Sequence, residues 1–191
     1  MANHVSSCLN FVTISEEGKK VVREIIETIR SRDTDKYSSH LGFAFTEELD
    51  TIDRNFMCER VGAKWAYLHD SNDEFMSFES AWSPVEEFVE SVIAQVAAVD
   101  ESVVARYTYE DEMPNFIGVQ VYNKDGLYDG EELDSEEMFE HLTQIAPELK
   151  EQYSEDEGFT DVGYEILNEI QWDFISDWQY NRSQEMMDFD D

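Results

Sequence analysis

In the first part of the chain, apolar residues at strand spacing are followed by apolar residues at helical spacing. From His4 to Ile14, apolar residues alternate with Ser, Asn and Thr, which predicts a strand. Ser15 followed by Glu16 and Glu17 supplies an N-cap hydroxyl and acidic first-turn residues. The apolar residues that follow have helical spacing: Val21, Val22, Ile25, Ile26 and Ile29. The pattern therefore predicts a helix that ends near Arg32.

The next segment is less regular. Residues 40–60 are apolar enough to pack, but their spacing fits neither strand nor helix, so we expect an irregular segment with a short helix. Residues 63–68 and 74–78 flank the polar turn 70–73 and predict a hairpin. We expect Trp65 and Trp82 on strand positions, with their rings in the core.

A second helix and a second hairpin follow. Ser83 and Pro84 predict a helix start with a hydroxyl cap and a proline at the first helical position. Two alternating runs, 103–109 and 116–122, predict the hairpin, and the pair Asp125-Gly126 marks a further tight turn. The order of strand, helix, hairpin, helix and hairpin predicts an α+β fold, in which two helices cover one face of an antiparallel sheet.

The chain beyond Asp134 has helical spacing. One helix, capped by Asp134 or Ser135, is expected to reach Ile145, and a longer one to span 162–178, with the charged linker 154–158 between them. We therefore divide the chain into an α+β domain, residues 1–130, and an acidic helical extension packed on it, residues 131–191. The last residues, 186–191, read as a frayed tail or as a short linear motif that orders on binding.

Charge excludes several classes of function. The chain has 45 Asp and Glu against 13 Lys and Arg, a formal net charge of -32. Such a chain repels phosphates, which excludes a conventional nucleic-acid binder and a protein attracted to anionic lipid. No apolar run is long enough to span a membrane and the N-terminus lacks a signal-peptide pattern, so we expect a cytoplasmic protein. Cys8 and Cys58 are expected to be reduced and partly buried.

Several stretches resemble a known family. Gly62-Ala63-Lys64-Trp65 and Ala81-Trp82-Ser83-Pro84 are the specific ones, and Arg106 to Glu110 with Phe116-Ile117-Gly118 add to the pattern. Over residues 1 to 130 the chain resembles the YubB-like, ferredoxin-like family of phage and plasmid proteins. That family commonly begins with Asn-Trp-Cys, whereas Asn3 here is followed by His4 and Val5. The resemblance implies a ferredoxin-like core and a mobile-element origin, and it implies no activity.

Motifs of catalysis and metal binding are missing from the sequence. The four histidines are dispersed, and neither a metal-ligand cluster nor a Gly-rich phosphate loop occurs. His69-Asp70 as base and orienter, and Cys58 as nucleophile, are the residues an enzyme would use. Residues 123–132 resemble a calcium loop, but Lys124 and Leu127 break the ligand alternation, so a hairpin turn at Asp125-Gly126 is the better interpretation. We predict a protein that is not an enzyme and has no cofactor or metal.

The negative charge itself is the best candidate for function. Residues 1–100 carry 9 basic and 19 acidic side chains, and residues 101–191 carry 4 and 26, which gives net charges of -10 and -22. Self-repulsion of this size destabilises a fold, and solubility does not require it. Acidic residues three or four apart share one helix face. Two such sets occur in the extension: Glu136, Glu137 and Glu140, and then Glu165, Glu169, Asp173 and Asp177.

These sets predict a DNA mimic. Arrayed carboxylates resemble a phosphate backbone and would occupy the basic nucleic-acid-binding surface of a host or defence protein. Trp172 is expected to contact the partner beside them, while Trp178 is expected in the core. Two alternatives stay open. In the first, the chain is a protein-binding adaptor that uses aromatic residues and a sheet edge, and its acidity serves solubility only. In the second, its acidity reflects an acidic host proteome. The partner's identity and the oligomeric state are open as well.

Overall fold

The computed structural model describes residues 3–33, 38–112, 115–154 and 158–188. The strands are β1 (His4–Thr13), β2 (Ala66–Ser71), β3 (Phe75–Ala81), β4 (Val104–Asp111), β5 (Phe116–Asn123), β6 (Gly126–Asp134), β7 (Tyr153–Ser154) and β8 (Gly158–Phe159). The α-helices are α1 (Glu16–Ser31), α2 (Arg54–Arg60), α3 (Glu86–Ala97), α4 (Ser135–Ile145) and α5 (Asp161–Met187). Short 3-10 helices span Leu41–Ala44, Leu49–Thr51 and Pro147–Gln152.

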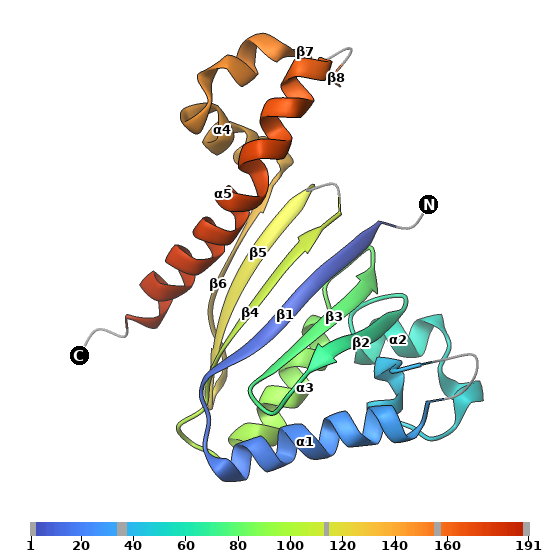
Figure 1. Cartoon of the computed structure of the whole chain (residues 1–191). Coiled ribbons are helices and arrows are strands. Elements are labelled where there is room, and N and C mark those ends of the chain that lie inside the picture. The colour runs from blue at the N-terminus through green and yellow to red at the C-terminus, as the bar shows by residue number, and fades with distance from the viewer. Residues whose placement is uncertain (1–2, 34–37, 113–114, 155–157, 189–191) are drawn as a thin grey trace.

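The architecture is α+β, as predicted. Six strands form one antiparallel sheet in the order β2-β3-β1-β4-β5-β6, and β7 pairs with β8 at the far end of the molecule (Figure 1). The hairpin turn predicted at Asp125-Gly126 is confirmed, but the strand that follows it, β6, was not among the predicted strands. It pairs with β5 from Gly126 to Asp134, so the expected domain boundary at residue 130 falls inside a strand.

The main core contains alternate residues of the central strands and the apolar stripes of α1 and α3. On β1 these are Val5, Leu9 and Phe11, and they pack with residues such as Val22 of α1 and Ile93 of α3. The intervening residues of β1, Ser6, Cys8 and Asn10, point to the other face because side chains alternate along a strand. On that other face, Ile117 of β5 packs with Ile175 of α5, and Val119 packs with Met186.

The predicted cap of α1 is confirmed. The Ser15 hydroxyl accepts a hydrogen bond from the Gly18 N–H at 3.2 Å, and Glu16 and Glu17 occupy the first turn. Asp134 rather than Ser135 caps α4, in a capping box with Glu137. The last helix continues to Met187, so the start of the expected tail is helical, with Met186 buried against β5. Residues 189–191 lie outside the described part of the chain.

The predicted start of α3 is wrong. The helix begins at Glu86 with no side-chain cap, and the Ser83 hydroxyl instead donates to the Gly62 carbonyl at 2.7 Å. The Val85 N–H, which is buried, donates to the phenol oxygen of Tyr107 at 2.9 Å. A residue from a distant strand therefore replaces the local cap.

Tyr107→Phe is expected to destabilise the fold by about 1–3 kcal/mol, because it leaves a buried N–H without an acceptor. Burial also raises the pKa of Tyr107, so its hydroxyl remains neutral. Thermal unfolding measures the change. Tyr164→Phe is the control, since that side chain is 52% exposed. An equal shift in both variants would show that the Tyr107 hydroxyl does not cap α3.

The two tryptophans expected on strands lie just outside them. Trp65 precedes β2 and is half-buried, with its ring against His4 and Tyr67. Trp82 follows β3, has a φ of 73° and is 54% exposed, so its expected place in the core is wrong. The chain leaves the sheet at this residue in a left-handed conformation, which turns the ring outward. Of the described helices, none combines the length and apolarity needed to cross a bilayer.

Candidate functional site

Helix α5 carries four rows of residues spaced four apart. The row that faces the sheet is buried and includes Gln171, Ile175, Gln179 and Ser183. Gln179 fixes this row to the sheet, because its amide Nε2 donates to the carbonyl oxygens of Tyr109 at 3.1 Å and Gly118 at 3.2 Å. A rigid connection to two strands therefore sets the orientation of the whole helix.

The acidic row lies two residues away from the buried row along its whole length. Each residue turns the helix by about 100°, so an offset of two places the carboxylates roughly 200° from the sheet-facing side chains. All four residues of the row are exposed: Glu165, Glu169, Asp173 and Asp177. Successive positions are about 6 Å apart along the helix axis, and the row extends over about 18 Å. Because the buried row follows the same spacing, the acidic row points away from the sheet at every turn.

The acidic row of α5 is longer than predicted from the sequence. Asp161 begins α5 and is exposed, and it precedes Glu165 by four residues. Asn181 interrupts the spacing, and Glu185 resumes it. The same four-residue count would have found Asp161 from the sequence.

Aromatic side chains border the acidic row. Trp172 is 48% exposed and shares a row with Tyr164 and Tyr180, which are 52% and 55% exposed. Trp178 is half-buried and packs against the Ile117 and Val119 clusters, in agreement with its expected place in the core. The partner surface predicted at Trp172 is thus accessible.

The second acidic set lies on α4. Glu136, Glu137 and Glu140 are all exposed. Glu137 is also structural, because its carboxylate accepts a hydrogen bond from the Asp134 N–H at 3.0 Å. Helices α4 and α5 pack through an apolar cluster that includes Leu142 and Ile170. The two acidic sets therefore lie on a packed pair of helices, of which α4 lies beyond the end of the sheet and α5 runs from there along the sheet (Figure 1).

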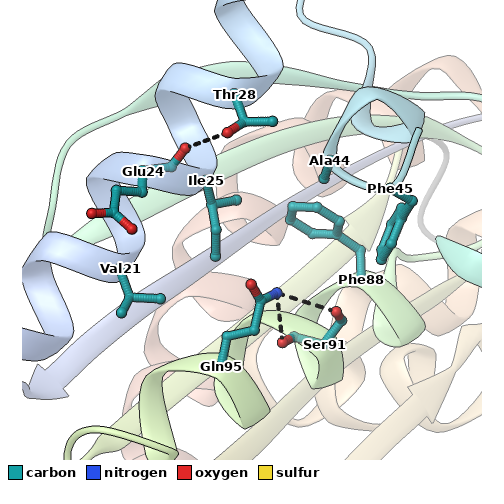
Figure 2. Close-up of a pocket in the computed structure, with 9 residues that line it drawn as sticks. All are labelled: Val21, Glu24, Ile25, Thr28, Ala44, Phe45, Phe88, Ser91 and Gln95. Atoms are coloured by element: carbon teal, nitrogen blue, oxygen red, sulfur yellow. Dashed lines mark hydrogen bonds between the residues drawn. The ribbon is translucent and has the colours of Figure 1, made fainter. Parts of the chain in front are cut away.

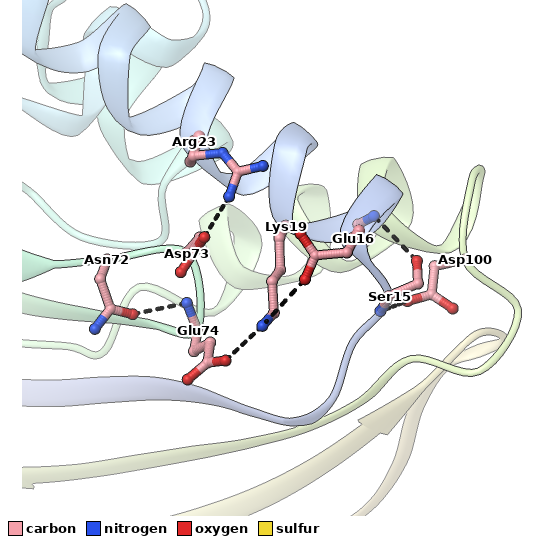
Figure 3. A network of polar contacts seen from close by, with 9 residues as sticks. Ser15, Glu16, Lys19, Arg23, Asn72, Asp73, Glu74 and Asp100 are labelled. Atoms are coloured by element: carbon pink, nitrogen blue, oxygen red, sulfur yellow. Dashed lines mark hydrogen bonds and ion pairs between the residues drawn. The ribbon is translucent and has the colours of Figure 1, made fainter.

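Several basic side chains of the first half form ion pairs with carboxylates of the same half. Lys19 Nζ lies 2.6 Å from the Glu74 carboxylate, and Arg23 pairs with Asp73 (Figure 3). These pairs join α1 to the turn between β2 and β3. In the described part of α5, Arg182 pairs with Glu131 and with Glu185, the latter at 2.8 Å. No ion pair among the described residues involves the four carboxylates of the acidic row.

The open part of the sheet forms a groove of about 400 Å³ beside α5. Side chains of β1, β3 and β4 line it, together with His69 of β2 and Gln179 of α5. Burial raises the pKa of the Glu110 carboxyl, and the hydrogen bond from Gln179 lowers it by less. Burial also raises the pKa of the Cys8 thiol, which therefore remains protonated at neutral pH and is a poor nucleophile.

The raised carboxyl pKa values predict that mild acid stabilises the fold. Burial raises the pKa of Glu86 and Glu110 above their ordinary value of 4.5, so the folded chain binds these protons more tightly than the unfolded chain. This contribution is fully present below pH 4.5 and is lost as the pH rises through the folded-state values. We expect these two carboxyls to raise the thermal midpoint as the pH falls from 7 toward about 4.5, against the opposite contribution of His40, whose pKa is lowered by burial. A midpoint that falls steadily over this range would contradict the prediction.

Asp100 sets the lower limit of that window. Burial alone would raise its pKa, but hydrogen bonds from Ser102 and Ser15 outweigh burial and lower the pKa below 3.8. The stability that these bonds contribute is present above pH 3.8 and is lost as Asp100 is protonated below it. Glu110→Gln is expected to reduce the stabilisation between pH 7 and 4.5, because it removes one of the two responsible groups.

The residues named for catalysis are not assembled. The Asp70 carboxylate accepts a hydrogen bond from the Ser71 N–H at 2.8 Å, and no described hydrogen bond joins it to His69. Cys8 and Cys58 are free thiols, and Cys58 is exposed on α2 rather than partly buried as expected. Residues 123–132 form a turn and most of β6. Among the described residues no group of three potential ligands is arranged to hold a metal ion.

A second hollow lies between α1 and α3 (Figure 2). Val21, Ile25 and Phe88 form its apolar part, and Thr28 and Gln95 bond to backbone carbonyls of their own helices. Glu24 is the one titratable side chain among those that line it. This hollow offers no set of converging catalytic groups.

Searches against protein-family models, curated proteins and solved structures found no match to this chain. The site is therefore assigned from its own geometry.

Proposed function

We propose that this protein is a DNA mimic, which binds and blocks the basic nucleic-acid-binding surface of a host or defence protein. The observation that carries the proposal is the outward row of carboxylates on α5, opposite the row fixed to the sheet. A rigid array of negative charge is what a groove built for a phosphate backbone attracts.

The carboxylates of α5 alone are less dense than the phosphates of DNA, so the proposed binding surface includes more than this helix. The row has one carboxylate per ~6 Å of helix axis, whereas one DNA strand has one phosphate per ~3.4 Å of duplex axis. The α5 row alone thus reaches about half the linear density of one strand. The exposed carboxylates of α4 add to it, so both sets belong to the proposed surface.

The proposal extends to fold and origin. The order β2-β3-β1-β4, with α1 and α3 in the main core, supports a ferredoxin-like unit with two helices on one face. The mobile-element origin implied by the YubB-like resemblance, and action in the cytoplasm of a host cell, are parts of the same proposal. We propose no catalytic activity for the protein.

Displacement of DNA tests the function. A pool of DNA-binding proteins from a bacterial lysate, purified on duplex DNA, is loaded with a fluorescent duplex and titrated with this protein. We expect release of the duplex, with a potency that falls at least about tenfold between 50 and 200 mM salt. A duplex that stays bound at every concentration would refute the proposal.

Exposed aromatics support a second candidate, a protein-binding adaptor. Trp172 and Tyr180 are about half exposed, and β6 forms one edge of the six-stranded sheet. Aromatic anchors supply affinity at interfaces, and strand edges accept further strands. Binding to a captured partner that is insensitive to salt, and lost in Trp172→Ala, would favour this candidate over mimicry.

A further inference from the structure

The groove beside α5 combines two carboxylates with a polar floor. It lies where β3, β1 and β4 run side by side (Figure 1). Its polar lining side chains include six on the sheet face opposite the main core, together with His69 of β2: Ser6, Cys8, Ser77, Glu79, Thr108 and Glu110. The groove is thus distinct from the outward row of α5.

The register of three strands sets the spacing of the carboxylates. Ser6 of β1 is paired with Glu79 on one side and with Glu110 on the other. Neighbouring strands lie ~4.8 Å apart, so the backbones of the two glutamates are roughly 10 Å apart across Ser6. One step along the groove, Ser77 and Thr108 flank Cys8 in the same way. The glutamates form two walls at one end, and hydroxyl groups and a thiol form the floor.

Among the described residues, no Lys or Arg forms an ion pair with either carboxylate. Glu110 is partly buried, and the Gln179 amide at 3.4 Å is its one described hydrogen-bond partner. Glu79 is paired with the His4 ring at 2.6 Å. Arg106 lies on the same face of β4, but it is paired with Asn10, four residues along β1 from Ser6, and it donates to the Ser183 hydroxyl of α5. The partly buried carboxylate of Glu110 therefore has no Lys or Arg partner in the described part of the chain to offset its desolvation.

We propose that this groove receives a single arginine side chain from a basic partner protein. A planar guanidinium with five N–H donors can bridge two carboxylates and donate to hydroxyls between them, which a compact ammonium does less well. Desolvation of Glu110 makes its hydrogen bond to a cation stronger than one in water. The inference rests on the proposed function for the class of partner, but it uses residues outside the acidic row.

Nuclear magnetic resonance with a small probe tests the groove. The probe is N-acetyl-arginine amide, titrated into the intact ¹⁵N-labelled protein. We expect amide shifts concentrated at Ser6, Cys8, Ser77 and Thr108. Glu110→Gln should reduce the affinity about tenfold, because one charged hydrogen-bond acceptor is lost. Glu101→Gln is the matched control, since it removes one exposed carboxylate outside the groove.

The outcomes separate this inference from the proposed function. A variant with the acidic row of α5 reversed to lysine should still bind the probe in the groove. The proposed arginine site would be overturned by amide chemical-shift changes concentrated along the acidic row of α5. An equal loss of affinity in Glu110→Gln and Glu101→Gln would overturn it as well. Failure of the probe to bind the wild-type protein, with displacement of duplex DNA unchanged, would leave the mimic intact and remove the arginine site.

Discussion

Replacing Gly118 by alanine is expected to destabilise the fold by about 3 kcal/mol, which corresponds to a fall in the thermal midpoint of roughly 6–12 °C. Gly118 on β5 lies directly across from Tyr109 on β4, and the Tyr109 ring covers its Cα. A methyl group at Gly118 would overlap the ring carbons and the hydroxyl of Tyr109. Thermal unfolding followed by circular dichroism measures the effect.

The Tyr109 ring has no space into which it can move. It is 3% exposed, and its centroid lies 5.5 Å from that of Tyr107 and 6.1 Å from that of Phe116. Its hydroxyl also donates to the Glu132 carboxylate at 3.0 Å. Displacement of the ring would therefore disturb both the core and the pairing of β4, β5 and β6, which position α5.

Gly130→Ala on β6 is the control. The nearest atom to an added methyl group there is the Gln120 Cγ at 3.0 Å, in a flexible side chain, so the cost is expected to be below about 1 kcal/mol. Equal midpoints for the two variants would show that the Tyr109 ring yields easily.

The sequence predicted the elements that depend on interactions between residues close together in the chain. The Ser15 cap and the stripe of α1 depend on neighbours in sequence, and the structure has both. The cap of α3 could not be predicted, because its acceptor is the phenol of Tyr107, 22 residues away. Apart from the turn at Asp125-Gly126, β6 lacked a strand signal, since its acidic and glycine residues are poor strand formers, and pairing with β5 determines its conformation.

The same contrast applies to the two candidate sites. The acidic row of α5 was predictable, because spacing within one helix determines which residues share a side. The groove was not, because it depends on the register that pairs Ser6 with Glu79 and Glu110, three residues from three strands. Register across strands follows from packing of the whole sheet, which no single segment encodes.

Reversing the acidic row of α5 to lysine is expected to weaken displacement of duplex DNA at least about 100-fold. The variant carries Lys in place of Glu165, Glu169, Asp173 and Asp177. Each exposed ion pair with a partner contributes up to ~1 kcal/mol, and reversal adds repulsion to the loss of four such pairs. The variant should fold, because all four side chains are exposed and the reversal replaces one row of like charges by another at the same spacing.

Reversing four carboxylates elsewhere on the protein distinguishes binding by a defined surface from attraction by net charge. Lysine at Glu48, Asp50, Glu59 and Glu101 changes the net charge equally, and these residues are exposed outside α4 and α5. If net charge alone attracts the partner, both variants lose potency to the same degree. If the row on α5 enters a basic groove, the control retains most of its potency, because its changes lie outside the contact and act only through the screened long-range field. Equal losses would thus argue against a located mimic surface, even if the wild-type protein displaces DNA.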